Sequence, residues 1–296
     1  MKSQFRHRYW NHINGWLLVL PAVFMISMFT HYPIITTLYH SFFSTGTAAH
    51  PAKFIGLENY SYLLKDEIFW KVLSNNFLYS VCTVPISIAI ALGMALLVNR
   101  NIKGLSLIRM SFFSPTILPM IAVANIWLFF YTPGYGLFDQ ILRAFGGNSH
   151  NWLGNLHTAL FCLIVMAIWK QSGFFMIFYL AALQQISPEL KEAGVAEGAG
   201  SWYYFRRVTF PLLMPTTLFV AINAVIESFI LVDHLVVMTK GGPNNATSLL
   251  LYYIYETAFS FWDSSYAATL TVVLVLILAV ITVIQFTTME KQIHYQ

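Results

Sequence analysis

Charged residues are scarce in this 296-residue chain. Asp, Glu, Lys and Arg make up only 9% of the sequence, whereas hydrophobic residues make up 57%. A soluble domain carries about a quarter charged residues, so this composition excludes an ordinary soluble protein and indicates a membrane protein. The formal net charge is +4, but the basic residues are spread through short loops. Because no basic stripe with interleaved aromatic residues is present, we expect no nucleic-acid partner.

Motifs for metal binding, disulfide formation and nucleotide hydrolysis are also missing. The two cysteines, Cys82 and Cys162, lie in apolar runs without a CxxC pair, which predicts packing residues. The nine histidines show no HExxH or other ligand spacing. No GxxxxGK[ST] phosphate loop is present, so the chain should not hydrolyse ATP by itself. We therefore expect a non-enzymatic chain with no catalytic residue, no bound cofactor and no metal.

Long apolar runs are what the chain has instead, and they predict an all-α polytopic membrane protein. A transmembrane helix needs about 20 mainly apolar residues. Six runs meet this length: 15–39, 74–98, 110–131, 157–183, 208–237 and 266–286. A cleaved signal peptide is the alternative for the first run, but its apolar part is too long and lacks a clear small-x-small cleavage site. We predict one transmembrane domain over residues 1–296 with an uncleaved first span.

Proline and aromatic residues shape the segments within and between these runs. Pro115 and Pro119 fall inside the third run and lack amide donors, so we expect a kink there. Residues 40–72 and 138–156 are predicted to be loops. Residues 249–262 are aromatic and amphipathic, and could form a helix that lies on the membrane surface.

The basic residues predict the orientation of the chain. Six spans place both termini on one side of the membrane. That side receives Lys2, Arg6, Arg8, Arg100, Lys103, Arg109, Lys191, Arg206, Arg207 and Lys291. The other side receives Lys53, Lys65, Lys71, Arg143 and Lys240. The richer side is expected to be cytoplasmic, which places both termini and the loop at 187–211 in the cytoplasm.

The segment from Ser187 to Pro215 is the most polar stretch between two apolar runs. Ser187 can cap a helix, and Pro188 suits the first helical position. Glu189 falls in the first turn, where the helix dipole favours a negative charge. Gly198 suits the helix end. These residues predict a short helix, and on physical grounds alone an ordinary cytoplasmic loop would explain it equally well.

The spacing within this segment resembles a known pattern. Permease subunits of binding-protein-dependent ABC importers carry a loop of the form E-A-A, three residues, G, nine residues, I-x-L-P. The residues at those spacings here are Glu192, Ala193, Gly194, Gly198, Val208, Phe210 and Pro211. Three of them depart from the pattern, with Gly194 for alanine, Val208 for isoleucine and Phe210 for leucine. The chain is most similar to the carbohydrate and sn-glycerol-3-phosphate branch of that family.

The resemblance implies a fold, a function and a set of partners. The fold would be that of a type I ABC importer permease, with six transmembrane helices and a cytoplasmic coupling helix. Residues Glu192, Ala193, Gly194, Gly198 and Pro211 would contact an ATPase subunit, with Glu192 meeting a basic residue there. The complex would contain a second homologous permease, two copies of an ATP-binding subunit that uses ATP and Mg, and a periplasmic or lipoprotein solute-binding protein. Its place would be the bacterial inner (plasma) membrane, in contact with lipid.

A second stretch resembles sugar permeases. Phe229, Asp233, Met238, Thr239, Gly241, Gly242 and Pro243 match the form F-x-x-x-D-x-x-x-x-M-T-x-G-G-P. The resemblance implies a periplasmic elbow at Gly241, Gly242 and Pro243, close to the docked binding protein. The alternative for these three residues is a plain helix terminator.

Ionisable and amide side chains in the apolar runs are candidates for the translocation pathway. Lys170, Glu227 and Asp233 lie at or near membrane depth, where charged groups usually face protein or a water-filled path. Gln171 and Asn223 could donate hydrogen bonds to hydroxyl groups of a sugar or glycerol phosphate. Alternatively, Lys170 snorkels or pairs with a carboxylate to lock two spans together.

Two other classes of membrane protein are alternatives to the importer. A secondary, ion-coupled transporter would need internal repeats with broken helices at matching positions, and no clear repeat is visible. A membrane-embedded enzyme would need acids, histidines or metal ligands that converge at one depth, and the histidines are scattered.

Overall fold

The computed structural model describes residues 15–46, 50–99 and 104–290, and its regular structure is helical. Within these ranges the only strand-like pairing is an isolated bridge between Phe43 and Phe54. The prediction of an all-α chain is confirmed. Six basic residues that entered the orientation prediction lie outside the described residues: Lys2, Arg6, Arg8, Arg100, Lys103 and Lys291.

The helices differ widely in length. A first helical segment, Gly15–His40, contains the π-helical turn η1 and the helix α2. The labelled elements, in chain order, are η1 (Ser27–His31), α2 (Tyr32–His40), α3 (Glu58–Lys65), α4 (Glu67–Val98), α5 (Leu105–Ile117), α6 (Met120–Phe130), α7 (Leu137–Ala144), α8 (Ala159–Gln185), α9 (Pro188–Ala196), α10 (Ser201–Tyr204), η2 (Phe205–Thr209), α11 (Phe210–Leu212), α12 (Met214–Ile230), α13 (Asp233–Met238), α14 (Leu250–Phe259) and α15 (Ser264–Glu290).

The chain divides into two compact units, and the smaller one combines an N-terminal segment with a segment near the C-terminus. Of the described residues it holds 15–46, 50–65 and 254–273. Within it, Asn59 Nδ2 donates to the carbonyl oxygens of Ser41 and Phe43 at 3.0 Å each. None of the residues in the most apolar window of Gly15–His40 is buried. That helix therefore leaves its side chains for lipid or for another chain.

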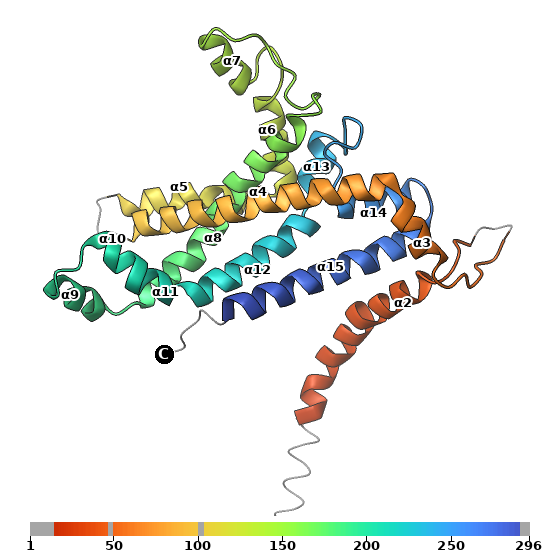
Figure 1. Cartoon of the computed structure of the whole chain (residues 1–296), viewed down its shortest axis with the longest axis horizontal. Helices are drawn as coiled ribbons and strands as arrows, with labels where there is room; N and C mark the ends of the chain where they lie inside the picture. Colours follow the sequence, from red (N-terminus) through yellow and green to blue (C-terminus); the bar gives the residue numbers. More distant parts are fainter. Residues whose placement is uncertain (1–14, 47–49, 100–103, 291–296) are drawn as a thin grey trace, which may run out of the picture. The chain divides into compact units, whose positions relative to one another are not determined.

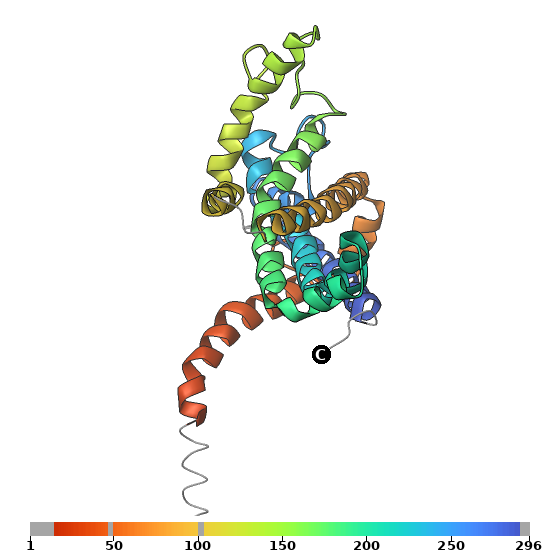
Figure 2. The same ribbon diagram turned by 90° about the vertical axis from the view of Figure 1, so that its left-hand side faces the viewer.

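The larger unit, with residues 66–99, 104–253 and 274–290, is centred on α4 and α8. These two helices pack along each other, and α5 and α12 pack against them (Figures 1 and 2). Tyr79 of α4, Trp127 of α6 and Leu163 of α8 belong to one buried cluster. Ala91 and Ala95 of α4 are fully buried as well, and small side chains of this kind let helices approach closely in a membrane. This packing fixes α8, which leads directly into α9.

Among the described residues, five helices are long and apolar enough to cross a membrane, and a bent pair of helices could supply a sixth span. The five are Gly15–His40, Glu67–Val98, Ala159–Gln185, Met214–Met238 and Ser264–Met289. The pair is α5 with α6, which meet at an angle of 100°. The polytopic helical class is confirmed, whereas a single kinked helix over 110–131 is wrong. The chain is extended at Leu118 and Pro119, so the kink expected at the prolines is a full break.

Four further segments differ from the expectations in detail. Helix α4 begins at Glu67 rather than at residue 74, because the Asp66 carboxylate caps it by accepting the Ile68 N–H at 2.9 Å. The expected loops at 40–72 and 138–156 contain α3 and α7, and the fifth run is divided by breaks around Leu213 and at 231–232. Helix α14 is present, but Leu250 and Tyr253 are buried. These two side chains pack on protein, whereas Tyr255 and Phe259 of the same helix are exposed. The place of α14 on the membrane surface therefore stays a prediction.

Candidate functional site

The segment that resembles the importer loop folds as a capped helix. The Ser187 Oγ accepts the Glu189 N–H at 3.3 Å, and Pro188 is the first residue of α9. At the other end, Gly198 has a φ of +76°, and its N–H donates to the Val195 carbonyl at 3.0 Å while the next amide donates to Gly194 at 2.9 Å. This pair of bonds around a left-handed residue is a Schellman motif, which favours glycine. The predicted cap and helix end are confirmed.

Helix α9 has no buried residue of its own. Glu192 and Ala193 are both exposed, and within the described residues Glu192 makes no ion pair. Nine-residue helices are marginal in isolation, and α9 covers little apolar surface within this chain. A surface of this kind is suited to docking on a partner, and Glu192 stands on it with its charge uncompensated.

Gly194 has a steric reason to depart from the alanine of the pattern. A Cβ atom at this position would lie 2.8 Å from Cδ2 of the Tyr204 ring, closer than van der Waals contact allows. The tyrosine belongs to α10, so its ring lies against the backbone of α9. A cavity of about 370 Å³ adjoins this contact, with Asn99, Gln184 and Lys191 in its lining.

Replacing Gly194 with alanine tests this contact. Alanine favours a helix over glycine by about 1 kcal/mol, but in the presence of Tyr204 we expect the clash to cancel that gain. In a Tyr204→Ala background, Gly194→Ala should stabilise α9. Hydrogen exchange of the α9 amides measures the difference. Gly93→Ala in α4 is the matched control, because a Cβ there would meet nothing within 4 Å. Equal effects of Gly194→Ala in both backgrounds would argue against the contact.

Pro211 follows a widened helical turn. It lies in α11 directly after the π-helical turn η2. A proline has no N–H for the carbonyl four residues earlier, which here belongs to Arg207. The wider turn is thus found where the regular helical bond cannot form, at the point where the loop returns to the membrane run.

Lys170 is bound to the break between α5 and α6. Its Nζ donates to the carbonyl oxygens of Pro115 at 2.9 Å and Leu118 at 2.7 Å. In a continuous helix the Pro115 carbonyl would accept the N–H of residue 119, but that residue is proline. The ammonium group replaces the missing donor. Pairing of Lys170 with a carboxylate, one of the two alternatives for this residue, is wrong for the part of the chain that the structure describes.

The other pathway candidates lie on three helices, α8, α12 and α13. Gln171 on α8 is 4% exposed, and neither its amide oxygen nor its amide nitrogen has a hydrogen-bond partner among the described residues. Asn223 on α12 donates to the Phe219 carbonyl at 2.7 Å, within its own helix. Glu227 on α12 is half-buried, and Asp233 is exposed in the first turn of α13. Within the part of the chain that the structure describes, no hydrogen bond or ion pair joins Lys170 to these four residues, or any two of the four to each other. Their shared role therefore stays a prediction.

The Gly-Gly-Pro stretch forms an ordered turn. We call residues 239–248 the elbow segment. Its Gly242–Pro243 peptide bond is cis, and the buried Thr247 hydroxyl donates to the Gly242 carbonyl at 2.7 Å. The periplasmic placement of Gly241, Gly242 and Pro243 stays a prediction.

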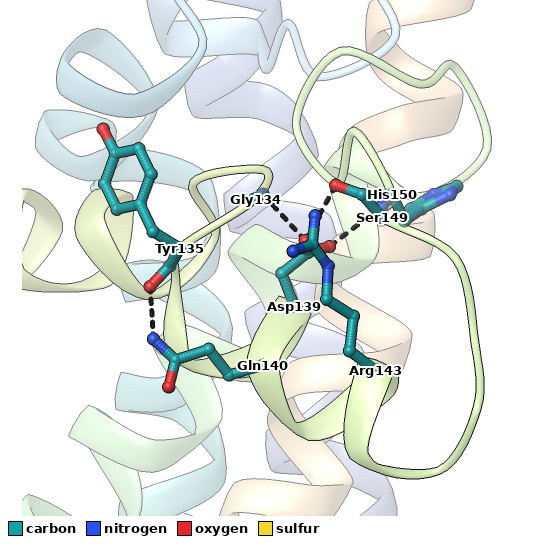
Figure 3. A network of polar contacts seen from close by, with 7 residues as sticks. All are labelled: Gly134, Tyr135, Asp139, Gln140, Arg143, Ser149 and His150. Carbon is teal, nitrogen blue, oxygen red and sulfur yellow. Dashed lines mark hydrogen bonds and ion pairs between the residues drawn. The ribbon is translucent and has the colours of Figure 1, made fainter.

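A buried aspartate that no sequence motif marks organises the loop between α6 and α8. The Asp139 carboxylate accepts the backbone N–H groups of Gly134 at 2.7 Å and His150 at 2.8 Å, and the Ser149 hydroxyl at 2.7 Å (Figure 3). Arg143 Nε lies 3.5 Å away. The His150 N–H and the Ser149 hydroxyl, with smaller contributions from Gly134 and Arg143, lower the pKa of Asp139.

The stability of the folded loop between α6 and α8 should therefore depend on pH only in acidic solution. Because the folded pKa of Asp139 is lowered, its contribution to stability is complete above the unfolded pKa of about 4 and is lost as the pH falls through the folded pKa. The protection factor of the His150 amide, which is its exchange rate corrected for the intrinsic rate at each pH, should be unchanged between about pH 7 and 5 and smaller at lower pH. Asp139→Asn should expose the loop at neutral pH, because its NH₂ group faces donors. Gln140→Ala, which removes one exposed bond to the Tyr135 carbonyl, is the control. An Asp139→Asn loop as protected as the wild type would contradict this assignment.

Known proteins similar to this chain were found by sequence and by structure. Residues 84–293 match the model of a family described as binding-protein-dependent transport system inner membrane component. The lactose transport system permease protein of Rhizobium radiobacter is 37% identical over 285 residues, which cover 94% of each chain. The sn-glycerol-3-phosphate transport system permease protein of Yersinia pestis is 31% identical over 282 residues, or 95% of each chain.

A further relative and a solved structure complete the comparison. The sulfoquinovosyl glycerol transport system permease protein of Agrobacterium fabrum is 35% identical, over 87% of this chain and 84% of its own. A crystallised bacterial ABC transporter involved in the import of the acidic polysaccharide alginate contains a chain with a TM-score of 0.84, at 21% identity, over 96% of this chain and 99% of its own. At that identity the likeness shows a shared fold.

Proposed function

The chain belongs to the family of binding-protein-dependent transport system inner membrane components, and on that premise we propose that it is one of two homologous permeases in an ATP-driven importer for a sugar or glycerol phosphate. As a family member it is a multi-pass inner membrane permease and not an enzyme. The observation that carries the proposal is the exposed, capped helix α9, with Glu192 and Ala193 on its surface. It lies inside the matched region, between two membrane-spanning helices.

In the proposed complex, other subunits would hydrolyse ATP and deliver the substrate. Two copies of an ATP-binding subunit would bind ATP and Mg and receive α9 in a groove, with Glu192 against a basic residue. A periplasmic or lipoprotein solute-binding protein would deliver the substrate on the opposite side. Both termini would be cytoplasmic, and residues 1–296 would act as one permease domain.

Helix α9 is placed to transmit motion from the ATPase. Only Ile186 and the cap residue Ser187 separate it from α8, and α8 packs along α4. A displacement of α9 is therefore carried into the largest packed pair of helices rather than absorbed by a flexible linker. In this mechanism closure of the ATPase dimer turns the pathway from inward to outward access.

The substrate would pass the polar side chains on α8, α12 and α13. We assign this pathway to Lys170, Gln171, Asn223, Glu227 and Asp233. The buried amide of Gln171 supports the assignment, because unpartnered buried polar groups are costly and a substrate hydroxyl would satisfy them. The substrate class is supported by the relatives, whose names give lactose, sulfoquinovosyl glycerol and sn-glycerol 3-phosphate.

ATP hydrolysis by the assembled complex in lipid vesicles tests the proposal. We would add the solute-binding protein loaded with lactose or with sn-glycerol 3-phosphate, and compare it with the unloaded protein. Stimulation by one loaded form is expected and would identify the substrate class. Uptake without ATP hydrolysis, or failure of any ATPase to assemble with the chain, would instead favour a secondary transporter.

A further inference from the structure

The elbow segment and the neighbouring parts of α12, α13 and α14 are attached to α4 by a row of polar side chains. Lys71, Asn75, Asn76, Tyr79 and Ser80 follow one another at helical spacing, and we call them the α4 polar stripe. We infer that this stripe positions the elbow segment so that it moves as one body with α4, α8 and the coupling helix α9. The inference rests on the proposed function, and it assigns positioning roles to residues outside both family motifs.

The outer end of the stripe binds the elbow segment through its backbone. Lys71 Nζ donates to the Asn244 carbonyl at 2.5 Å. Asn75 Nδ2 donates to the carbonyls of Asn245 at 2.8 Å and Ser248 at 3.1 Å. Because all three acceptors are main-chain oxygens, these bonds fix the path of the chain itself. Two of the residues involved, Asn244 and Asn245, have positive φ angles of 47° and 57°, so the path they hold is one that the chain does not adopt readily.

Asn76 joins two helix ends at one buried point. Its side chain is fully buried. The amide nitrogen donates to the Ser228 carbonyl at 3.3 Å, and the amide oxygen accepts the Leu250 N–H at 3.0 Å. Ser228 lies in the last turn of α12, and Leu250 is the first residue of α14. Helix ends leave such carbonyl and N–H groups without intrahelical partners, so one side chain satisfies an orphan group of each helix.

The inner end of the stripe extends the same attachment to α13. The Tyr79 hydroxyl lies 3.1 Å from His234 Nε2, and the Ser228 hydroxyl donates to Ser80 Oγ at 2.9 Å. All four side chains are buried. The break at 231–232 and the elbow segment after it are therefore held from one side, along two turns of α4.

The attachment connects two surfaces that the proposed mechanism must link. Helix α4 packs along α8, and α8 leads into α9 at its far end. The elbow segment lies at the opposite end of α8 from α9, beside α13 (Figure 1). Coupling between distant sites can be carried by a continuous set of packed side chains, hydrogen bonds and rigid helices. The α4 polar stripe completes such a set, and it makes the elbow segment a rigid contact for the solute-binding protein rather than a lid.

Removing the amides of the stripe tests the inference. Asn75→Ala deletes the bonds to Asn245 and Ser248, Asn76→Leu deletes those to Ser228 and Leu250, and Asn76→Asp keeps only the acceptor for Leu250. Asn125→Ala is the matched control, because Asn125 is exposed and donates only to the Ile121 carbonyl of its own helix, at 2.8 Å. Each variant is assembled with its partners in lipid vesicles.

Two measurements are made on each variant. Amide hydrogen exchange over residues 244–250 should be faster by at least about tenfold in Asn75→Ala and Asn76→Leu, less in Asn76→Asp, and unchanged in Asn125→Ala. ATP hydrolysis stimulated by the loaded binding protein should fall by at least about tenfold in the first two, while the basal rate stays within about twofold of wild type. A role in folding alone would lower both rates together.

The outcomes separate the inference from the proposed function. A wild-type complex that no loaded binding protein stimulates would overturn the proposed function, and the inference with it. A second outcome is that the loaded binding protein stimulates ATP hydrolysis by the wild type and equally by variants in which the elbow segment exchanges faster. That outcome would overturn the inference alone. If Asn76→Leu does not assemble, Asn75→Ala decides, because Asn75 is only half-buried and its acceptors lie in a loop.

Discussion

Replacing Glu192 with alanine should abolish most ATP-driven uptake while leaving the chain in the membrane. The carboxylate is exposed on α9 and makes no ion pair within the described residues, so in the complex its partner would come from the ATPase. Removing one member of a desolvated charge pair costs about 2–5 kcal/mol, and about 1.4 kcal/mol is a factor of ten in affinity. We expect the ATPase to bind at least about 30-fold more weakly. Alanine is the strongest helix former, so α9 itself should persist.

The measurement is copurification of the ATPase with the permease, together with uptake at equal membrane levels. Glu189→Gln is the control, because Glu189 lies on the same helix, is exposed and stands outside the family pattern. Wild-type uptake by Glu192→Ala at matched expression would remove Glu192 from the interface. Equal losses in both variants would indicate that the overall charge of α9 matters rather than one contact.

Replacing Lys170 with methionine should destabilise the whole larger unit. The substitution keeps the apolar stem and removes both bonds to the break between α5 and α6. Hydrogen bonds to charged groups are worth about 1.5–3 kcal/mol each, and after discounting for the partial exposure of Lys170 we expect a loss of about 2–4 kcal/mol. That is a large part of the stability of a typical domain, about 5–15 kcal/mol. Lower membrane levels and a lower melting temperature in detergent are the expected results.

A double substitution isolates the cause of this effect. Alanine at position 119 restores an N–H that can donate to the Pro115 carbonyl. Lys170→Met should therefore cost less in a Pro119→Ala background than in the wild type. If Lys170→Met lowers the melting temperature by the same amount in both backgrounds, the ammonium group does not act through the break. The role of Lys170 would then lie elsewhere in the pathway.

Features set by neighbours in the sequence could be predicted, and those set by distant residues could not. The cap at Ser187 and the helix end at Gly198 depend on residues a few positions away, and both are confirmed. The cap of α4 at Asp66 is of the same kind, and its signal was present in the sequence. By contrast, the partners of Lys170 lie more than 50 positions earlier. Pro119 indicated a kink, but the 100° angle depends on side chains from α8.

Some residues of the candidate site could likewise be predicted from the sequence, and others could not. The spacing from Glu192 to Pro211 is visible in the sequence, because the whole loop is one continuous segment. The surroundings of Asp139 and Asn76 were both missed. Asp139 binds loop residues only 5 to 11 positions away, but no recognised motif links them to it. Asn76 binds residues 152 and 174 positions away. Asn75 and Asn76 gave a weak signal, as adjacent amides at the edge of an apolar run. The groups to which they form hydrogen bonds lie about 150 to 175 residues away in the sequence. No local sequence pattern covers such a separation.

The contact between Gly194 and Tyr204 also limits how this loop can evolve. An alanine at position 194 would restore the family pattern but would meet the ring 2.8 Å away, so that mutation is opposed while the tyrosine remains. The substitutions can occur in the reverse order. A smaller residue at position 204 is compatible with glycine at position 194, and the change from glycine to alanine can then follow without the clash. Substitutions at the two positions are therefore interdependent. In descendants with alanine at position 194, we expect that the tyrosine at position 204 was replaced first.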